Sequence, residues 1–387
     1  MNYNFDKAVD RRRSESLKWI RYEEDILPMW LADMDFECPE IMLDALRERI
    51  NHRILGYHQE PHGLREVIIE RLKRKHCLDV APESIVFFPG VVNSLSLIYR
   101  AILKPSDGVI VHTPAYPPFL SGPQKSKLVC HDQELTYVKC GRYEMDPESF
   151  KASIKKSDRL FILCNPHNPA GRVFTRDELY HIAKICLEKR LIICSDDIHC
   201  DIVYSGSKYI PIASLDKEIA GHTITLMSPS KAFNIPALKT SMAIIPNADL
   251  REKVILSRDD MDMGVNILGA IATLSAYRDC QPWLDELKKY LEDNKETMMR
   301  YVETELSGIQ LSRIEGTFLA WLDCRQAGIP GNPQEFFLEY AKVAVNDGVS
   351  FGKVGKGFVR LNFGCPRHIL LEGLGRMKKA INEFGCK

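Results

Sequence analysis

A lysine behind a Ser-Pro-Ser turn is the first candidate for chemistry in this sequence. Lys231 lies in the stretch TLMSPSKAFNIPALKTS, and Lys239 follows eight residues later. Lysines in such turns are usually solvated, but an amine held in a pocket can form a Schiff base with a carbonyl compound. Other candidate residues end the remaining apolar runs, which are Gly90 in FFPG, Tyr116 in VHTPAY, Asn168 in LCNPHNPAG and Asp196 in CSDDIH.

A phosphate site is predicted around the two lysines. Ser228, Ser230 and Lys239 offer two hydroxyls and an ammonium within twelve residues. The helix expected to begin at Val91 would add free backbone N–H groups, which bind anions at helix starts. A pair of serines before a helix more often caps it, so the prediction depends on the rest of the set.

A flat, cationic aromatic ring fits the remaining groups. Asp196 ends a buried strand, where a carboxylate is costly unless it meets a cation such as a pyridinium N–H. Asn168 can donate to a phenolate oxygen, and Tyr116 can stack on a ring. With Lys231 as the amine, these features indicate pyridoxal 5′-phosphate (PLP). An NAD site is the alternative for such a sheet, but no G-x-G-x-x-G follows a strand.

The elements that would position these residues form an α/β core. Between about residues 62 and 250, apolar β-branched runs such as SIVFFPG, RLFILCNP and LIICSDD alternate with helical patterns. Thr175 and Glu178 have the spacing of a capping box at one helix start. The pattern predicts a parallel sheet covered on both faces. Ligands bind outside the carboxyl ends of such strands, so the strand ends should converge on one crevice.

Three parts of the chain are expected. Residues 46–280 should form the large PLP-binding α/β domain, and residues 281–387 a smaller α+β domain that residues 1–45 join. The stretch PWLDELKKYLEDNKETMMRYVETEL predicts a long helix between the two domains. GVSFGKVGKGFVRLNFG and HILLEGLGRMKKAINEF predict strands and a closing helix.

Bulk composition excludes several classes of function. The 387 residues include 52 basic and 52 acidic side chains, so no net field would recruit nucleic acid or an anionic membrane. No apolar run approaches the length of a membrane span. The twelve cysteines contain no Cys-x-x-Cys pair, and no metal site is expected. These features predict a protein of a reducing compartment, the cytoplasm.

Several motifs in order give the chain a family resemblance. NPHNPAGRVFTRDEL, SDDIHCDIVY, SPSKAFNIPALKTS and GFVRLNFGCPR resemble the fold-type I PLP-dependent enzymes, the aminotransferase class I/II superfamily, over nearly the whole chain. LPMWLADMDFECP and GYHQEPHGLREVI resemble the MalY/PatB-type cystathionine β-lyase (C–S lyase) branch. The resemblance implies an aspartate aminotransferase-like fold, with a large, mostly parallel seven-stranded sheet domain and a smaller α+β domain.

The resemblance also implies roles for single residues. Lys231 would form the Schiff base and move the Cα proton, and Asp196 would keep the pyridine nitrogen protonated. The cofactor contacts that it implies are Val91, Val92, Tyr116, Asn168, Asp196, His199, Ser228, Ser230, Lys231 and Lys239.

The substrate and a second subunit are implied in the same way. Arg360 would clamp the substrate α-carboxylate, near Asn168 and Trp30. Tyr57 would reach the phosphate of a neighbouring subunit and act in catalysis there, which implies a homodimer with shared active sites. The sequence departs from the family pattern at Asp197, where glutamate is more common, and at Lys239, where many relatives have arginine.

The implied reaction is α,β-elimination. Cystathionine, cysteine or a cysteine S-conjugate would yield pyruvate, ammonia and a thiol. Transamination of neutral amino acids is the alternative, because the sequence does not fix where the Cα proton goes. A PLP-bearing regulatory protein is a further alternative.

Overall fold

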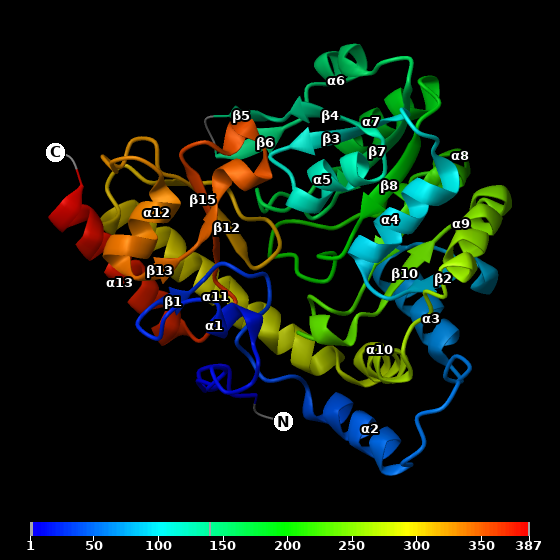
Figure 1. Cartoon of the computed structure of the whole chain (residues 1–387), viewed down its shortest axis with the longest axis horizontal. Helices are drawn as coiled ribbons and strands as arrows, with labels where there is room; N and C mark the ends of the chain where they lie inside the picture. Colours follow the sequence, from blue (N-terminus) through cyan, green and yellow to red (C-terminus); the bar gives the residue numbers. More distant parts are fainter. Residues whose placement is uncertain (1–2, 139–140, 386–387) are drawn as a thin grey trace.

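Two β-sheets and the helices around them make up the computed structural model, which describes residues 3–138 and 141–385. The larger sheet lies in the middle of the chain, and the smaller sheet is formed by the C-terminal third (Figure 1). Helix α11, Gln281–Glu305, runs between them. With 25 residues it is about 37 Å long, as the sequence predicted for a connecting helix.

The large sheet has seven strands in the order β2-β10-β9-β8-β7-β3-β4. Strand β10 is antiparallel to both of its neighbours, and the other neighbouring pairs are parallel. This confirms the predicted mostly parallel α/β fold. The strands are β2 Ile85–Phe88, β3 Gly108–Thr113, β4 Val129–Glu134, β7 Asp158–Cys164, β8 Ile192–Asp196, β9 Thr223–Met227 and β10 Ser241–Ile244.

Both faces of this sheet are buried, which explains the unbroken apolar runs. Val109 and Val111 of β3 pack in one hydrophobic cluster, and Ile110 between them packs in another. Side chains alternate across a strand, so each face needs its own layer of helices. Helices α4 Val91–Ile102, α5 Pro117–Lys125 and α9 Ala248–Asp260 cover one face. Helices α6 Pro147–Ser153, α7 Arg176–Glu188 and α8 Lys217–Gly221 cover part of the other face, and α3 Leu64–His76 and α10 Ile267–Asp279 cover the rest.

Helix α2, Glu40–Asn51, packs against α10. Helix α7 begins with the expected capping box, in which Thr175 and Glu178 satisfy each other's backbone N–H groups. A hairpin of β5 Thr136–Val138 and β6 Arg142–Glu144 and short 3₁₀ turns at Pro82–Ser84, Ile212–Ser214 and Pro236–Leu238 complete this part.

The small sheet has the order β11-β12-β15-β14. Its strands are β11 Gln310–Leu311, β12 Leu319–Asp323, β14 Asn346–Asp347 and β15 Phe358–Asn362. Helices α12 Pro333–Phe336 and α13 Arg367–Phe384 accompany it, with a π turn at Phe337–Ala341 between α12 and β13.

The N-terminal segment lies against these C-terminal elements. It contains α1, Leu17–Ile20, and β1, Leu27–Pro28, which pairs in parallel with β13, Val343–Ala344. The proposed domain boundaries at residues 45 and 280 stay predictions.

The stretch GVSFGKVGKG differs from the expected strand. It forms two 3₁₀ turns, Gly348–Phe351 and Lys353–Gly355, and only the following FVRLN is a strand. Gly352 and Gly357 have φ angles of 116° and 83°, which strands do not tolerate. Within the described residues no helix combines the length and apolar character that a membrane span needs.

Candidate active site

A cavity of about 410 Å³ opens at the carboxyl ends of the parallel strands. Nine of the ten predicted cofactor contacts line it, and so does Arg360. These residues come from segments more than 250 positions apart, and parallel strands bring them together because their carboxyl ends share one edge. The cavity is large enough for a small cofactor with a substrate.

Lys231 lies in this cavity and not on the surface. Its Nζ donates a hydrogen bond of 2.6 Å to the backbone oxygen of Ala32. Burial lowers its pKa to about 8, opposed by the charge of Asp33 and reinforced by that of Arg360. An amine with this pKa is partly neutral near pH 8, the form that attacks carbonyl carbon.

Asp196 ends β8 and is 4% exposed. One carboxylate oxygen accepts a 3.1 Å hydrogen bond from the N–H of Ile198. Burial raises its pKa to about 7, opposed by the hydrogen bond from Ile198 and by the charge of Lys231. A pyridinium N–H would add a positive charge at this carboxylate and favour its ionised form.

The adjacent Asp197 has a structural environment. It is buried outside the cavity lining, and it accepts hydrogen bonds from the hydroxyls of Ser195, at 2.6 Å, and Tyr209. The family departure at this position therefore leaves the cavity wall unchanged.

The start of helix α4 forms one end of the cavity. Gly90 precedes it with φ 100° and ψ 149°, a conformation that only glycine adopts easily. The N–H groups of Val91 and Val92 have no partner within the helix, because the first turn of any helix leaves its donors free. Ser230 and Lys239 line the same cavity.

Ser228 is the one predicted cofactor contact outside the cavity lining. Its hydroxyl donates to the backbone oxygen of Thr240 at 2.6 Å and accepts from the N–H of Ser230 at 3.1 Å. It thus shapes the loop that presents Ser230 and Lys231. Its direct contact with a phosphate stays a prediction.

Aromatic and polar groups form the walls around the middle of the cavity. Tyr116 packs edge-on against Phe119, with ring centroids 5.5 Å apart. His199 is buried, and burial holds its pKa well below the usual value. Its Nδ1 has no hydrogen-bond partner among the described residues, and buried polar atoms of this kind normally have one. A polar group of a ligand would satisfy it.

Arg360 is a fixed, buried cation on β15. Its two terminal nitrogens donate to the Asn168 side chain at 3.0 Å, the Trp30 backbone oxygen at 2.9 Å and the Asn346 side chain at 2.6 Å. Its Nε has no partner among the described residues. Burial lowers its pKa to about 10, so it is charged at neutral pH, and no carboxylate of the described residues pairs with it. A substrate carboxylate would be attracted to this charge.

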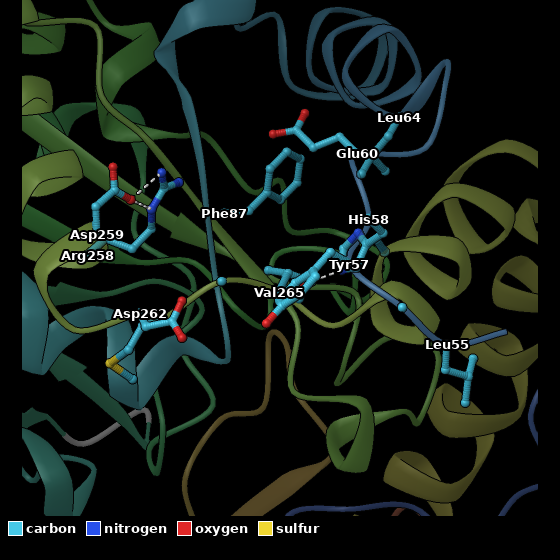
Figure 2. A pocket seen from close by; sticks show the side chains of 14 residues that line it. Leu55, Tyr57, His58, Glu60, Leu64, Phe87, Arg258, Asp259, Asp262 and Val265 are labelled. Atoms are coloured by element: carbon cyan, nitrogen blue, oxygen red, sulfur yellow. Dashed lines mark hydrogen bonds and ion pairs between the residues drawn. The ribbon is translucent and has the colours of Figure 1, made fainter.

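Two predicted residues lie elsewhere. Trp30 supplies its backbone oxygen to Arg360 but its ring is not part of the cavity wall. Tyr57 is fully exposed and lines a separate cavity of about 770 Å³, with His58, Phe87 and Val265 (Figure 2). Within one chain, Tyr57 does not reach the site of Lys231.

Some residues of the site were not identified from the sequence. Asp33 lines the cavity, and Asn346 orients Arg360. Asp33 belongs to LADMDF, so the motif contained the signal. Asn346 had no local signal, because its role arises from the pairing of β14 with β15.

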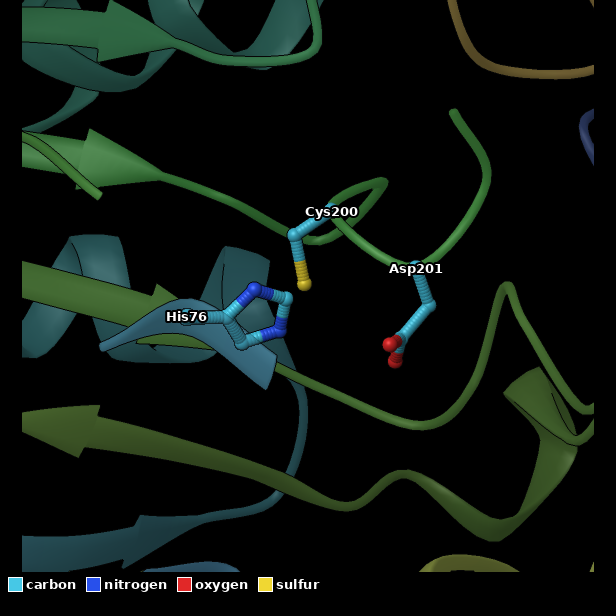
Figure 3. Close-up of side chains that lie close together, drawn as sticks. All are labelled: His76, Cys200 and Asp201. Carbon is cyan, nitrogen blue, oxygen red and sulfur yellow. The ribbon is translucent and has the colours of Figure 1, made fainter. Parts of the chain in front are cut away.

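A second group of ligand-type side chains lies apart from the cavity. One ligand atom each of His76, Cys200 and Asp201 lies within 4.8 Å of the others (Figure 3). Asp201, however, accepts a 2.5 Å hydrogen bond from Arg71. The guanidinium already supplies the positive charge that this buried carboxylate requires.

Comparisons with known proteins agree with this geometry. The family model for aminotransferase class I and II matches residues 31–376. The cystathionine β-lyase PatB of Bacillus subtilis (strain 168) is 38% identical, over 98% of this chain and 100% of PatB. The chain belongs to the aminotransferase class I and II family. These findings confirm the predicted family and its cystathionine β-lyase branch.

Two solved structures of this family match the whole fold. Cystalysin from Treponema denticola, which contains a pyridoxal 5′-phosphate cofactor, has a TM-score of 0.95 and 32% identity, covering 99% of this chain and 100% of cystalysin. The PLP-bound C–S lyase of Staphylococcus hominis has a TM-score of 0.93 and 33% identity, covering 99% and 100% of the two chains. They confirm the predicted fold.

The residues of the cavity fit this cofactor. Burial disfavours the charged form of Asp196, and His199 Nδ1 has no hydrogen-bond partner among the described residues. The first N–H groups of α4 have no acceptor within the helix. A protonated pyridine ring with an oxygen substituent and a phosphate would offer a partner to each. Lys231 is the amine in the same cavity.

Proposed function

We propose that this protein is a PLP-dependent C–S β-lyase that acts on cystathionine or related cysteine S-conjugates. One observation supports this proposal most strongly. A single cavity contains the buried amine of Lys231, the fixed guanidinium of Arg360, which can bind a carboxylate, and the buried carboxylate of Asp196, which a cation would stabilise. Two of these groups suit the cofactor, and Arg360 suits an amino-acid substrate.

The residues of the chain divide the work of the elimination. When bound, PLP supplies the electron sink that stabilises negative charge at the substrate Cα. Arg360 holds the α-carboxylate and thereby fixes which Cα bond faces Lys231. Lys231 Nζ takes the Cα proton, the C–H electrons form the Cα–Cβ double bond, and the Cβ–S electrons leave with sulfur. The thiol takes up a proton, and addition of water to the three-carbon remainder releases pyruvate and ammonia.

The reaction is tested by giving the purified holoenzyme cystathionine without any keto acid. Steady release of pyruvate and homocysteine thiol supports elimination. A single turnover that stops with the cofactor in its pyridoxamine form would contradict it and favour transamination. The Lys231→Ala variant is the control. Borohydride should bleach the visible absorption band of the wild-type protein and leave the reduced cofactor attached to the peptide that contains Lys231.

We also propose that the working unit is a homodimer with shared active sites. Every residue from 51 to 60 is exposed, including the apolar Ile54 and Leu55 and the aromatic Tyr57. Exposed apolar groups in a row usually mark an interface. Tyr57 would reach the cofactor phosphate of the partner. Sedimentation of the holoenzyme as a monomer at micromolar concentration would contradict this proposal.

The cellular location is proposed to be the cytoplasm. The ten cysteines within the described residues are free of disulfides, and seven of them are buried. Free thiols in this number suit a reducing compartment.

A further inference from the structure

The amine of Lys231 rests on the N-terminal segment. Its Nζ donates to the backbone oxygen of Ala32 at 2.6 Å, and both Ala32 and Asp33 line the cavity. Contact across 199 positions of sequence brings these two short stretches together. The N-terminal segment therefore supplies a wall of the site as well as a cover for the small sheet.

Asp33 presents a carboxylate with one unused oxygen. Its Oδ2 accepts from Arg11 at 2.7 Å, while its Oδ1 is buried without a hydrogen-bond partner among the described residues. Arg11 is itself fixed, since it donates to the Asp35 side chain at 2.6 Å and to the Met34 backbone oxygen at 3.1 Å. These contacts of Arg11 fix the position of the Asp33 carboxylate. A buried carboxylate oxygen normally accepts a hydrogen bond from a donor, which Oδ1 does not do among the described residues.

Four charged or polar side chains interact with the amine of Lys231. Asp33 and Asp196 favour its ammonium form, whereas Arg360 disfavours it. His199 is also near, because the charge of Lys231 helps to lower the pKa of its ring. Asp196 is expected to be paired with the cofactor ring. Asp33 then remains as the carboxylate available to the ammonium of Lys231.

We propose that Asp33 is a positioning residue which, with the Ala32 carbonyl, holds the ammonium form of Lys231 and so favours elimination over transamination. The proposal rests on the proposed lyase function. In both reactions Lys231 Nζ removes the Cα proton. In elimination the Cβ–S bond breaks with its electron pair on sulfur while the proton stays on Nζ. In transamination Nζ would instead have to give that proton up to the bound cofactor, and acceptors that stabilise the ammonium of Lys231 would slow this transfer.

The first test uses the cofactor-free protein and measures the protonation of Lys231 directly. Competitive acetylation across a pH series, read by mass spectrometry of the Lys231 peptide, gives the midpoint for this amine. In Asp33→Asn the midpoint should fall by about one pH unit. Asp35→Asn is the matched control, because it removes a charge that shares Arg11 but does not line the cavity.

The outcome of this labelling decides the role of Asp33. An unchanged midpoint in Asp33→Asn, or an equal fall in Asp35→Asn, would overturn the proposal. Near-ultraviolet circular dichroism of each variant shows that the comparison is made on folded protein. If Asp33 had a purely structural role, both Asp33→Asn and Asp35→Asn would lower stability. The midpoint for acetylation of Lys231 would then not fall in Asp33→Asn alone.

The second test measures the fate of the proton in the holoenzyme. With cystathionine and no keto acid, Asp33→Asn should convert about tenfold more cofactor to the pyridoxamine form for each pyruvate released. Added keto acid should reverse that loss. A wild-type ratio in this variant would overturn the proposal. If the wild-type protein released no pyruvate at all, the proposed function would fail, while the labelling result on Lys231 would still stand by itself.

Discussion

Arg360 shows how a single side chain is prepared before a substrate arrives. The residue is 4% exposed, and its guanidinium is held by Asn168, Asn346 and the backbone of Trp30. Holding a long side chain in place beforehand lowers the entropy that binding must overcome. The remaining unpaired Nε then marks where an anion is still required.

Replacing Arg360 with lysine should impair binding more than chemistry. Lysine keeps the charge but cannot form a planar fork with a carboxylate. The lost hydrogen bond to a charged group corresponds to about 1.5–3 kcal/mol, or roughly a tenfold to hundredfold lower kcat/KM. Most of the change should appear in KM, measured by pyruvate release. A lower kcat at unchanged KM would contradict the assigned role.

The raised pKa of Asp196 leads to a prediction about the stability of the cofactor-free protein. Burial raises its folded pKa to about 7 from the ordinary 3.8. A carboxyl with a raised pKa stabilises the fold fully only below the unfolded value, and that contribution is lost as the pH rises through the folded value. The cofactor-free protein should therefore lose stability between about pH 4 and pH 7 through this group.

Asp196→Asn should remove that dependence. Without cofactor, this variant should exceed the wild type in free energy of unfolding at pH 8 by an amount of order 2–4 kcal/mol, with a smaller difference at pH 5. Urea unfolding at both pH values measures it. An equal difference at the two pH values would show that ionisation is not the cause. With cofactor bound, the order should reverse, because the ring loses its charged partner.

At the scale of elements, the start of helix α4 links backbone geometry to ligand binding. Gly90 has φ 100°, and an added Cβ there would meet no atom within 4 Å. Space is therefore not the constraint, and the backbone conformation is. The first turn of α4 leaves its N–H groups free, and their orientation depends on the backbone conformation that Gly90 permits.

Gly90→Ala should weaken cofactor binding. The strain of about 1–3 kcal/mol would be relieved by a shift of the first turn, and PLP affinity should fall roughly tenfold. Gly206→Ala is the matched control, since Gly206 has φ 84°, equal free space and no place in the cavity lining. Both variants should lose stability, but only Gly90→Ala should release cofactor faster on dilution. Equal cofactor affinity in both would disprove the link.

At the scale of the whole molecule, the proposed dimer makes each site depend on two chains. Lys231→Ala and Tyr57→Phe would damage different halves of one composite site. Mixed and refolded together, the two inactive or weakened proteins should recover about a quarter of wild-type activity, because half of random dimers are hybrids with one intact site. Pyruvate release at limiting PLP measures the recovery. Mixtures no more active than their components would contradict shared sites.

The parts of this molecule that local patterns determine were predictable. Buried strands with polar ends gave β2, β3, β7, β8 and β9, and with them Asp196, Asn168 and Lys231. Strand β4 has a half-exposed pattern. Strand β10 has the sequence Ser-Met-Ala-Ile, with one β-branched residue, so it lacks the β-branched and aromatic composition that identifies β2. Their presence followed from the family resemblance instead.

The parts of the site that depend on contacts between distant segments could not be predicted from local sequence patterns. Arg360 was predicted from a motif, but Asn346 faces it only through the pairing of two strands. Ser228 was assigned to a phosphate, and the structure shows its hydroxyl bonded to Thr240. This bond spans twelve residues and joins the end of β9 to the start of β10, so sequence spacing does not reveal it.

The hydrogen bonds of Arg360 have a consequence for synthesis of the protein. One guanidinium joins residue 30, residue 168 and residue 346, and itself lies on the strand that ends at residue 362. A chain emerging from the ribosome lacks this tie until nine-tenths of its length is made. We therefore expect a nascent chain to acquire a complete site only after this last strand has been made.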